Sequence, residues 1–261
     1  MYKRQGIVEK VGSEVKNFKP GDHVILSFYS DGTCDNCLKG VPTQCRSYAK
    51  YNLSGVRADG DDHFTENGKH VSDMFNQSSF TTTTVVDQRN AVKVDSKLDL
   101  RKLGPLGCGY VTGSGTVFNT LKPKPGDTIA VFGTGAVGLA AMMAGRISGC
   151  IKVIAVDIVP ERLELAKELG ATHAINSKEE DPVEKIKELT GGYGVDWTVD
   201  TTGLSSVIMN SVAALAQGGT CAAIAVTPHL IELSTWNDLC VDDKKLSLIH
   251  ISEPTRLQLI S

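Results

Sequence analysis

The feature that most constrains the fold is a glycine turn between a predicted strand and a predicted helix. The apolar run TIAVF at residues 128–132 leads into GTGAVG, and a helical pattern follows. In the spacing G-x-G-x-x-G, the first glycine makes the tight turn and the second admits a pyrophosphate. The third glycine packs helix on strand, while the helix N-terminus offers free N–H groups. A tight turn without a ligand is the alternative. The candidate cofactor-binding residues are Gly133, Gly135, Ala136, Val137 and Gly138.

Strands and helices alternate over the second half of the chain. Apolar runs at residues 128–133, 152–157, 173–176, 195–200 and 220–226 are separated by segments with helical periodicity. This pattern is typical of parallel strands joined by crossover helices. The sequence therefore predicts an α/β fold that contains a doubly wound parallel sheet of the Rossmann type.

Asp157 ends the second of these strands, about twenty residues past the turn, where a carboxylate can accept both ribose hydroxyls of an adenosine. The same charge would repel a 2′-phosphate, so NAD is predicted in preference to NADP. Arg162 stands one turn into the next helix and either helps to hold the ribose or is a solvated helix residue. Two later strand ends supply candidate nicotinamide-side contacts, although ordinary loop residues fit the spacing equally well: Thr201, Thr202, Ile224, Ala225 and Val226.

The first part of the chain has a different pattern. From residue 6 to about 94, short alternating runs such as GIVEKVG, KPGDHVILSF, FTTTTVV and NAVKVD are broken by turn signals, which predicts a small β domain. A polar stretch with little periodicity, residues 31–77, lies between these runs. Its length is typical of a functional excursion rather than of a tight connection.

Three cysteines of this excursion, Cys34, Cys37 and Cys45, have the spacing C-x2-C-x7-C, and ligands three residues apart on a turn can reach one tetrahedral zinc ion. The same step counted back from Cys34 reaches Asp31, whose carboxylate is an acceptable, harder ligand. We therefore predict a zinc site of these four residues. A weakened site with a loose fourth position and free thiols without metal are the alternatives. Cys108 has apolar neighbours, and such a lone cysteine is usually a buried packing residue.

Composition narrows the class of function. The 261 residues are 41% hydrophobic and 22% charged, with a formal charge of −3. Without a basic cluster, there is no electrostatic reason to expect nucleic acid or an anionic membrane as partner, and no apolar stretch has the length of a membrane span. Seven cysteines, an odd and scattered set, favour a reducing compartment. We predict a cytoplasmic protein that acts on small molecules.

The two ends of the sequence are expected to come from an adapter oligonucleotide rather than from the gene. Read in one direction, with GTG as start codon, one oligonucleotide encodes MYKRQ, and its reverse complement encodes LSLIH at residues 246–250. Two natural termini are the alternative. We therefore treat residues 1–5 and 246–261 as adapter-like scars. The alternating LSLIHIS run is nevertheless expected to be able to pair with an exposed sheet edge.

The order of these parts resembles that of zinc-dependent medium-chain alcohol dehydrogenases. The motifs that carry the resemblance are GIVEKVG, KPGDHV, the cysteine loop, a Cys-Gly-x-x-Thr-Gly segment, GTGAVG and the ribose aspartate. They cover residues 6–245. Residues 105–119 look most like the aryl-alcohol (benzyl-alcohol) branch of the family.

This resemblance implies a partial GroES-like catalytic domain at residues 6–110 and a Rossmann NAD-binding domain at residues 111–245, with its last strand truncated. It implies oxidation of primary, aryl alcohols to aldehydes by hydride transfer to NAD, in a homodimer or homotetramer with two zinc ions per chain. The structural zinc then falls on Cys34, Cys37 and Cys45, with Asp31 where the family usually has cysteine. The catalytic zinc falls on Cys108.

Other ligands that the family uses for the catalytic zinc are missing from the sequence. These are an upstream cysteine and a histidine whose place coincides with Tyr2, with Lys3 in the place of the following glutamate. We therefore expect this chain, as written, to lack alcohol dehydrogenase activity. Two other functions stay open: a zinc-free quinone oxidoreductase-like member of the same superfamily, against which the cysteine loop argues, and a noncatalytic NAD-binding module.

Overall fold

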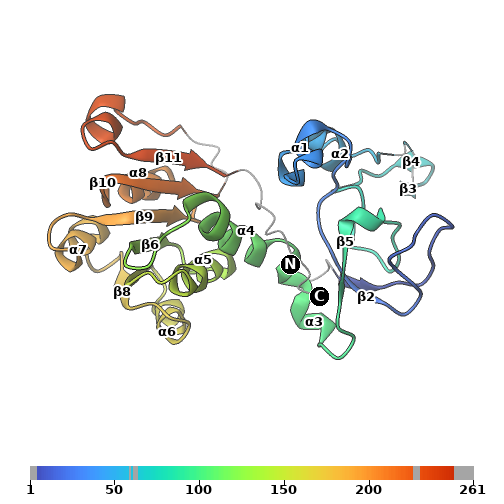
Figure 1. Ribbon diagram of the computed structural model, residues 1–261, viewed down its shortest axis with the longest axis horizontal. Helices are drawn as coiled ribbons and strands as arrows, with labels where there is room; N and C mark the ends of the chain where they lie inside the picture. Colours follow the sequence, from blue (N-terminus) through green and yellow to red (C-terminus); the bar gives the residue numbers. More distant parts are fainter. Residues whose placement is uncertain (1–4, 59, 61–63, 226–229, 250–261) are drawn as a thin grey trace. The chain divides into compact units, whose positions relative to one another are not determined.

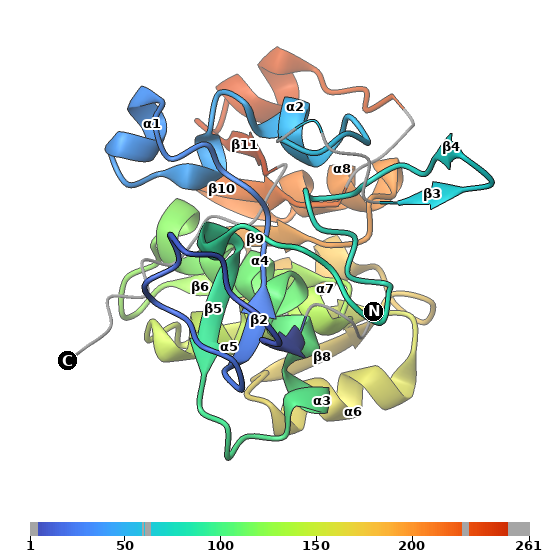
Figure 2. The same cartoon turned by 90° about the vertical axis from the view of Figure 1, so that its right-hand side faces the viewer.

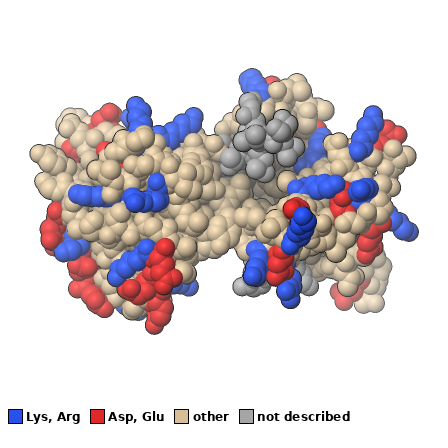
Figure 3. Space-filling model, turned by 60° about the horizontal axis from the view of Figure 1, so that its bottom comes forward, with Lys and Arg blue, Asp and Glu red and all other residues tan. Residues whose placement is uncertain are grey.

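The computed structural model describes residues 5–58, 60, 64–225 and 230–249, so Tyr2, Lys3 and Val226 lie outside the described residues. The chain forms two compact units, and the boundary between them falls between Cys108 and Gly109 (Figure 1). Basic and acidic side chains are interspersed on the face shown in Figure 3. That face therefore has no extended patch of one charge.

The first unit is built on a three-stranded antiparallel sheet with the order β1-β2-β5. Its strands are β1 (Gln5–Ile7), β2 (His23–Leu26) and β5 (Ala91–Val94). The central strand β2 buries Val24, Ile25 and Leu26. Two short helices follow the sheet, α3 (Leu100–Leu103) and the 3-10 helix η3 (Gly104–Gly107).

A long excursion connects β2 to β5, as the sequence predicts. Its described residues form short elements only: α1 (Asp35–Leu38), η1 (Pro42–Gln44), α2 (Tyr48–Asn52), the hairpin of β3 (Thr65–Glu66) and β4 (Lys69–His70), and η2 (Gln88–Asn90). The FTTTTVV run, residues 80–86, is irregular although its alternation suggests a strand. Phe80 is 75% exposed and Val85 60% exposed, so this run lacks the buried face that would fix a strand.

The second unit begins with α4 (Gly109–Gly115) and the π-helix η4 (Thr116–Leu121) and continues into a six-stranded parallel sheet (Figures 1 and 2). The sheet order is β11-β10-β9-β6-β7-β8, so the chain starts at the centre, moves outward to β8 and returns to β9. The strand order therefore reverses between β6 and β9. The strands are β6 (Thr128–Phe132), β7 (Lys152–Asp157), β8 (His173–Asn176), β9 (Val195–Asp200), β10 (Leu215–Ala223) and β11 (Lys245–Leu248).

Crossover helices bury both faces of this sheet. The helices are α5 (Ala136–Ile147), α6 (Pro160–Glu168), α7 (Pro182–Leu189) and α8 (Ser205–Ala213), and the π-helix η5 (Thr235–Cys240) precedes β11. Alternate residues of one strand belong to different core clusters: Ile129 and Val131 pack in one, Ala130 and Phe132 in another. This explains the continuous apolar runs in the sequence, because a strand buried on both faces has no polar side.

The edge strand β11 includes Leu246, Ser247 and Leu248 from the LSLIHIS run. It pairs in parallel with β10, in the register Thr220 to Lys245 and Ala223 to Leu248. The expectation that this run pairs with the sheet edge is therefore confirmed. Backbone pairing with the exposed edge of β10 holds this segment, because a sheet edge presents unpaired N–H and C=O groups.

Candidate functional site

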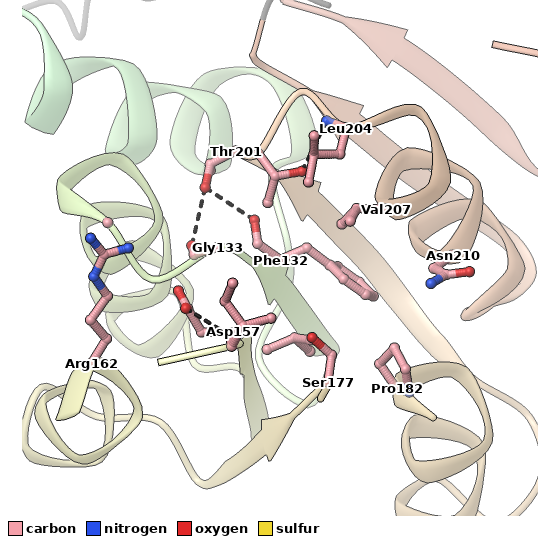
Figure 4. Close-up of a pocket in the computed structure, with 14 residues that line it drawn as sticks. Phe132, Gly133, Asp157, Arg162, Ser177, Pro182, Thr201, Leu204, Val207 and Asn210 are labelled. Carbon is pink, nitrogen blue, oxygen red and sulfur yellow. Dashed lines mark hydrogen bonds between the residues drawn. The ribbon is translucent and has the colours of Figure 1, made fainter. Parts of the chain in front are cut away.

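A cavity of about 320 Å³ lies at the carboxyl ends of the strands in the second unit (Figure 4). Its walls come from the ends of β6, β7 and β9, where the strand order reverses. Doubly wound sheets bind their ligands at this place. The predicted residues that line the cavity are Gly133, Gly135, Asp157, Arg162, Thr201 and Thr202.

The glycine turn is shaped partly by internal packing and partly by the open space beside it. Gly133 has a φ of +90°, and a Cβ there would lie 2.5 Å from the Thr201 hydroxyl oxygen, so the turn itself needs this glycine. Gly138 packs against the carbonyl oxygen of Gly133 and has no room for a side chain. A Cβ on Gly135, by contrast, would meet no heavy atom within 4 Å. The missing side chain at Gly135 therefore leaves space for a ligand beside the N-terminus of α5, where free N–H groups attract phosphate.

The carboxylate of Asp157 is buried and fully hydrogen-bonded. Its Oδ2 accepts hydrogen bonds from the Thr134 backbone N–H and from the Thr134 hydroxyl, both at 2.7 Å. Its Oδ1 accepts from the backbone N–H groups of Ile158 at 2.7 Å and Val159 at 3.0 Å. Burial alone would raise the pKa of Asp157, but these hydrogen bonds hold it below its ordinary value.

These four bonds add a condition to the predicted ribose contact. A carboxylate has about four lone-pair positions, and the protein already uses all of them. Two ribose hydroxyls must therefore share lone pairs with backbone donors or displace the Thr134 hydroxyl. That hydroxyl is the one donor of the four that can rotate away.

Thr201 ties the end of β9 to the glycine turn. Its hydroxyl donates to the carbonyl oxygens of Phe132, at 3.0 Å, and Gly133, at 3.1 Å (Figure 4). The neighbouring loop is held by the fully buried Asp200, which accepts hydrogen bonds from the Thr202 hydroxyl at 2.7 Å and the Gly203 N–H at 3.1 Å. The two threonines therefore border the cavity in fixed positions.

Among the residues that the structure describes, Arg162 is the only basic side chain that lines this cavity. It is exposed on α6, and within the described part of the chain its guanidinium has no hydrogen bond or ion pair. The charge is therefore available to a bound anion. A position beside Asp157 suits either the ribose or a phosphate attached to it.

The remaining predicted cofactor residues that the structure describes do not line the cavity. Ala136 and Val137 form the first turn of α5, Ile224 follows β10 and donates its N–H to the Asp200 carbonyl oxygen at 2.9 Å, and Ala225 comes next. Sequence reasoning missed several lining residues that follow β8, lie on α7 or α8, or stand just before α8. The residue after β8 could have been predicted from the rule that ligands bind beyond the carboxyl ends of strands. No comparable sequence rule identifies the lining residues on the helices. The missed residues include Ser177, Pro182, Leu204, Val207 and Asn210.

A second candidate site lies in the cysteine loop of the first unit. One ligand atom from each of Asp31, Cys34, Cys37 and Cys45 lies within 4.8 Å of all the others. Tetrahedral zinc with sulfur ligands at about 2.3 Å would bring them to roughly 3.8 Å from one another. A small contraction of the loop therefore accommodates the ion, and the structure brings together all four predicted ligands.

Asp31 organises this loop as well as facing the thiols. Its Oδ1 accepts hydrogen bonds from the backbone N–H groups of Thr33, at 2.8 Å, and Cys34, at 2.9 Å. These bonds are the main reason that its pKa is far below the ordinary value. Its Oδ2 accepts from the Cys45 thiol at 3.2 Å. Once Cys45 loses its proton, Oδ2 is the oxygen free to bind a cation.

The three thiols differ in how readily they ionise. Burial raises the pKa of Cys37 to about 12, and contact with Cys34 adds to this effect. Burial also raises the pKa of Cys45, whereas backbone N–H groups, first that of Arg46, lower the pKa of Cys34. Because zinc binds thiolates, an ion entering the loop has to displace protons, and its affinity falls as pH falls.

An ion pair joins the two ends of the cysteine loop. Arg46, next to Cys45, donates from Nη2 to the Asp35 Oδ2 at 2.8 Å and also from Nε to Oδ1. This pairing lowers the pKa of Asp35 to about 2. The loop is therefore closed by protein contacts in addition to any metal.

Cys108 lies apart from these clusters. It is half-buried, follows η3 and donates its N–H to the Pro105 carbonyl oxygen at 3.2 Å. In the described part of the chain, no group of three or more metal-ligating side chains includes it. Its predicted role as a catalytic zinc ligand stays a prediction.

Comparison with known proteins matches both units. Residues 4–96 match the alcohol dehydrogenase GroES-like domain family and residues 136–258 the zinc-binding dehydrogenase family. The chain is 43% identical over 256 residues to geraniol dehydrogenase from Castellaniella defragrans, covering 97% of this chain and 68% of that protein.

Two crystal structures of similar proteins agree with this match. The alcohol dehydrogenase zinc-binding domain protein from Burkholderia ambifaria has a TM-score of 0.89 at 42% identity, covering 95% of this chain and 68% of that one. Benzyl alcohol dehydrogenase from Acinetobacter calcoaceticus has a TM-score of 0.88 at 38% identity, and the match covers 97% of this chain and 69% of that one.

Among the described residues, no helix combines the length and apolar character needed to cross a bilayer.

Proposed function

Since the chain belongs to the zinc-dependent medium-chain alcohol dehydrogenases, we propose that it derives from an enzyme that oxidises primary, aryl alcohols to aldehydes with NAD. The cavity at the switch point of the parallel sheet carries this proposal, because it combines an open glycine turn, a helix N-terminus and a buried carboxylate. Similarity to a benzyl alcohol dehydrogenase supports the aryl substrate. A homodimer or homotetramer is the assembly that we propose.

Different residues of the cavity would bind different parts of the dinucleotide. The space beside Gly135 and the N-terminus of α5 would receive the pyrophosphate. Asp157 would accept the ribose hydroxyls in exchange for the Thr134 hydroxyl, and its charge would disfavour a 2′-phosphate. Thr201 and Thr202 border the side on which we place the nicotinamide. When bound, NAD supplies the hydride acceptor.

We propose two roles for zinc. Asp31 and the three thiols of the cysteine loop would hold a structural ion, because a closed set of four ligands leaves no position for substrate. Cys108 would contribute one ligand to a catalytic ion, which supplies Lewis-acid polarisation of the alcohol when bound. One thiolate does not make such a site. We therefore expect no turnover from the chain as written.

Two alternatives make different predictions for the same protein. A zinc-free quinone oxidoreductase-like enzyme would bind no metal in the cysteine loop, and the convergence of four ligand atoms there argues against it. A noncatalytic NAD-binding module would bind the dinucleotide and structural zinc without turnover, which is also the behaviour that we expect of the chain as written. An assay with benzyl alcohol and NAD, on this chain and on its Cys108→Ala variant, tests for turnover, and turnover would exclude the module. Zinc-dependent turnover lost in Cys108→Ala would contradict our expectation of inactivity.

The cofactor proposal is tested by calorimetric titration with NAD and NADP. We expect tighter binding of NAD and a loss of about 1.5 to 3 kcal/mol, roughly 10- to 150-fold in affinity, in Asp157→Asn. Asp196→Asn is the matched control, because Asp196 accepts the same pair of hydrogen bonds from Thr128, both at 2.7 Å, and does not line the cavity. Equal affinity for the two cofactors would contradict the proposal.

A further inference from the structure

We propose that Arg89 is a positioning residue for the cysteine loop: it fixes the backbone of Asp31 and thereby sets how slowly the loop releases zinc. This inference rests on the zinc site proposed above. Arg89 lies in η2, far from the loop in sequence, and is absent from the predicted ligand set. It would act through Asp31 rather than by touching the metal.

The guanidinium of Arg89 reaches the start of the loop directly. Its Nη1 donates a hydrogen bond to the backbone carbonyl oxygen of Asp31. Its Nη2 donates to the Tyr29 hydroxyl at 3.0 Å, and the guanidinium carbon lies 5.1 Å from the centre of the Tyr29 ring. One side chain therefore holds two positions of the segment that leads into the ligands.

Arg89 is itself held in place. Nε donates to the Oδ1 of Asp87 and Nη2 to its Oδ2, both at 3.0 Å, so the planar fork is fixed at both ends. Tyr29 is 8% exposed and its backbone N–H donates to Oδ1 of the fully buried Asn52 at 2.8 Å. Arg89 thus links the loop to a buried, hydrogen-bonded part of the first unit.

The loop leaves room for this side chain. Gly32 has a φ of +72°, and a Cβ there would lie 2.6 Å from the Nη1 of Arg89. A larger residue would push the guanidinium away from Asp31. Gly32 therefore serves both the left-handed backbone and the access of Arg89.

Fixing the backbone of Asp31 has consequences for the ligands. The Oδ1 of Asp31 sets the turn that carries Cys34, and its Oδ2 faces the thiol of Cys45. Without Arg89, the loop would have to order this segment when zinc binds. Losing a partner that orients metal ligands typically lowers metal affinity by about 10- to 100-fold. We expect faster zinc release by a similar factor.

The chain contains a matched control for the ion pair. Arg101 donates from Nε to Oδ1 of Asp99 at 3.0 Å and from Nη2 to Oδ2 at 3.1 Å, almost the geometry of Arg89 on Asp87. Its side chain is 89% exposed, and among the described residues it hydrogen-bonds only Asp99. Arg101→Ala therefore removes an equivalent pair without touching the loop.

The experiment measures zinc release from the full zinc-loaded chain to a coloured chelator, with zinc per chain from elemental analysis. We expect release roughly 10- to 100-fold faster in Arg89→Ala, an intermediate rate in Arg89→Lys, and the parent rate in Arg101→Ala. If Arg89→Ala does not fold, Arg89→Lys decides, because lysine keeps the charge but loses the fork. A parent rate in the folded Arg89 variants, or equally fast release in Arg101→Ala, overturns the inference. A parent chain without zinc in the loop overturns the zinc site as well.

Discussion

The two units differ in what they bury. In the second unit, apolar residues of the sheet and helices form continuous clusters on both faces of the sheet. In the first unit, the described residues bury more polar than apolar side chains. The apolar ones are Val24, Ile25, Leu26, Tyr29, Cys45 and Tyr48. The polar ones are Asp22, Thr43, Asn52, Arg57, Asp73, Asn76, Gln77 and Asn90.

This difference indicates two ways of holding a fold together. Apolar burial is non-directional and tolerates repacking, so the core of the second unit does not depend on the geometry of any one contact. Buried polar groups stabilise only while their partners are present, and removing one partner leaves the other unsatisfied. The first unit therefore depends on particular hydrogen bonds and, in our proposal, on a metal ion. Both tryptophans, Trp197 and Trp236, lie in the second unit, so their fluorescence reports on that unit.

The largest expected difference follows removal of zinc. Binding of a structural zinc is worth about 10 to 16 kcal/mol in small peptides, more than any one side chain contributes. Chelation of the zinc-loaded chain should therefore remove hydrogen-exchange protection from residues 31–52 and leave the tryptophan emission unchanged. Cys37→Ser should act like chelation. Cys240→Ser, which alters an exposed cysteine of the second unit, is the control; equal effects of the two substitutions would refute the assignment.

A cavity in the apolar core should affect only the second unit. Ile154 is completely buried in β7, and Ile154→Ala should lower the free energy of unfolding by about 2 to 5 kcal/mol. Denaturant titration followed by tryptophan fluorescence measures this value. Ile151 is 60% exposed just before the strand, so Ile151→Ala should change stability by no more than about 0.5 kcal/mol. Similar losses in both variants would show that burial does not dominate here.

Removing one buried amide should weaken the first unit. Asn52 accepts a hydrogen bond from the Tyr29 N–H and donates to the carbonyl oxygens of Tyr29, at 2.8 Å, and Tyr48, at 3.0 Å. Asn52→Ala leaves these groups unsatisfied and should cost about 1 to 3 kcal/mol. Denaturant titration followed by near-ultraviolet circular dichroism of the tyrosines measures this loss. The exposed Asn17→Ala variant should behave like the parent. An unchanged unfolding midpoint in Asn52→Ala would mean that the polar network is dispensable.

The smallest effect should be a dependence on acid. Lys93 donates to the Oδ1 of Asp22 at 2.7 Å, which is the main reason that the pKa of Asp22 is lowered. The folded pKa lies below the unfolded value of about 3.9, so this stabilisation is present above about pH 4 and is lost as pH falls through the folded pKa. Urea titrations at several pH values measure the free energy of unfolding, and its dependence on pH in this range should be weaker in Asp22→Asn. Asp95→Asn is the control and should keep the pH dependence of the parent. Parallel curves for the parent and Asp22→Asn would contradict the prediction.

The same difference explains which features could be predicted from sequence. The strands and helices of the second unit follow apolar periodicity, and the glycine turn and Asp157 lie where motif spacing puts them. The excursion of the first unit has no such periodicity, so residues 80–86 gave a misleading strand signal. Spacing predicted which four side chains of the cysteine loop converge, because these residues are close in sequence. Arg89 and Asn52 act over long sequence separations, and no local pattern reveals them.

The hydrogen bonds of Asp157 also determine what nucleotide binding would cost. Its lone pairs are occupied by Thr134 and by the backbone N–H groups of Ile158 and Val159. The carboxylate is therefore hydrogen-bonded before a nucleotide arrives. Arrival of a ribose would then be an exchange of one hydroxyl donor for another, with little change in the number of hydrogen bonds. What the carboxylate would add to affinity is its charge, which makes each ribose hydrogen bond stronger than one to a neutral amide and disfavours a 2′-phosphate. The phosphates and the apolar walls would supply the rest of the affinity.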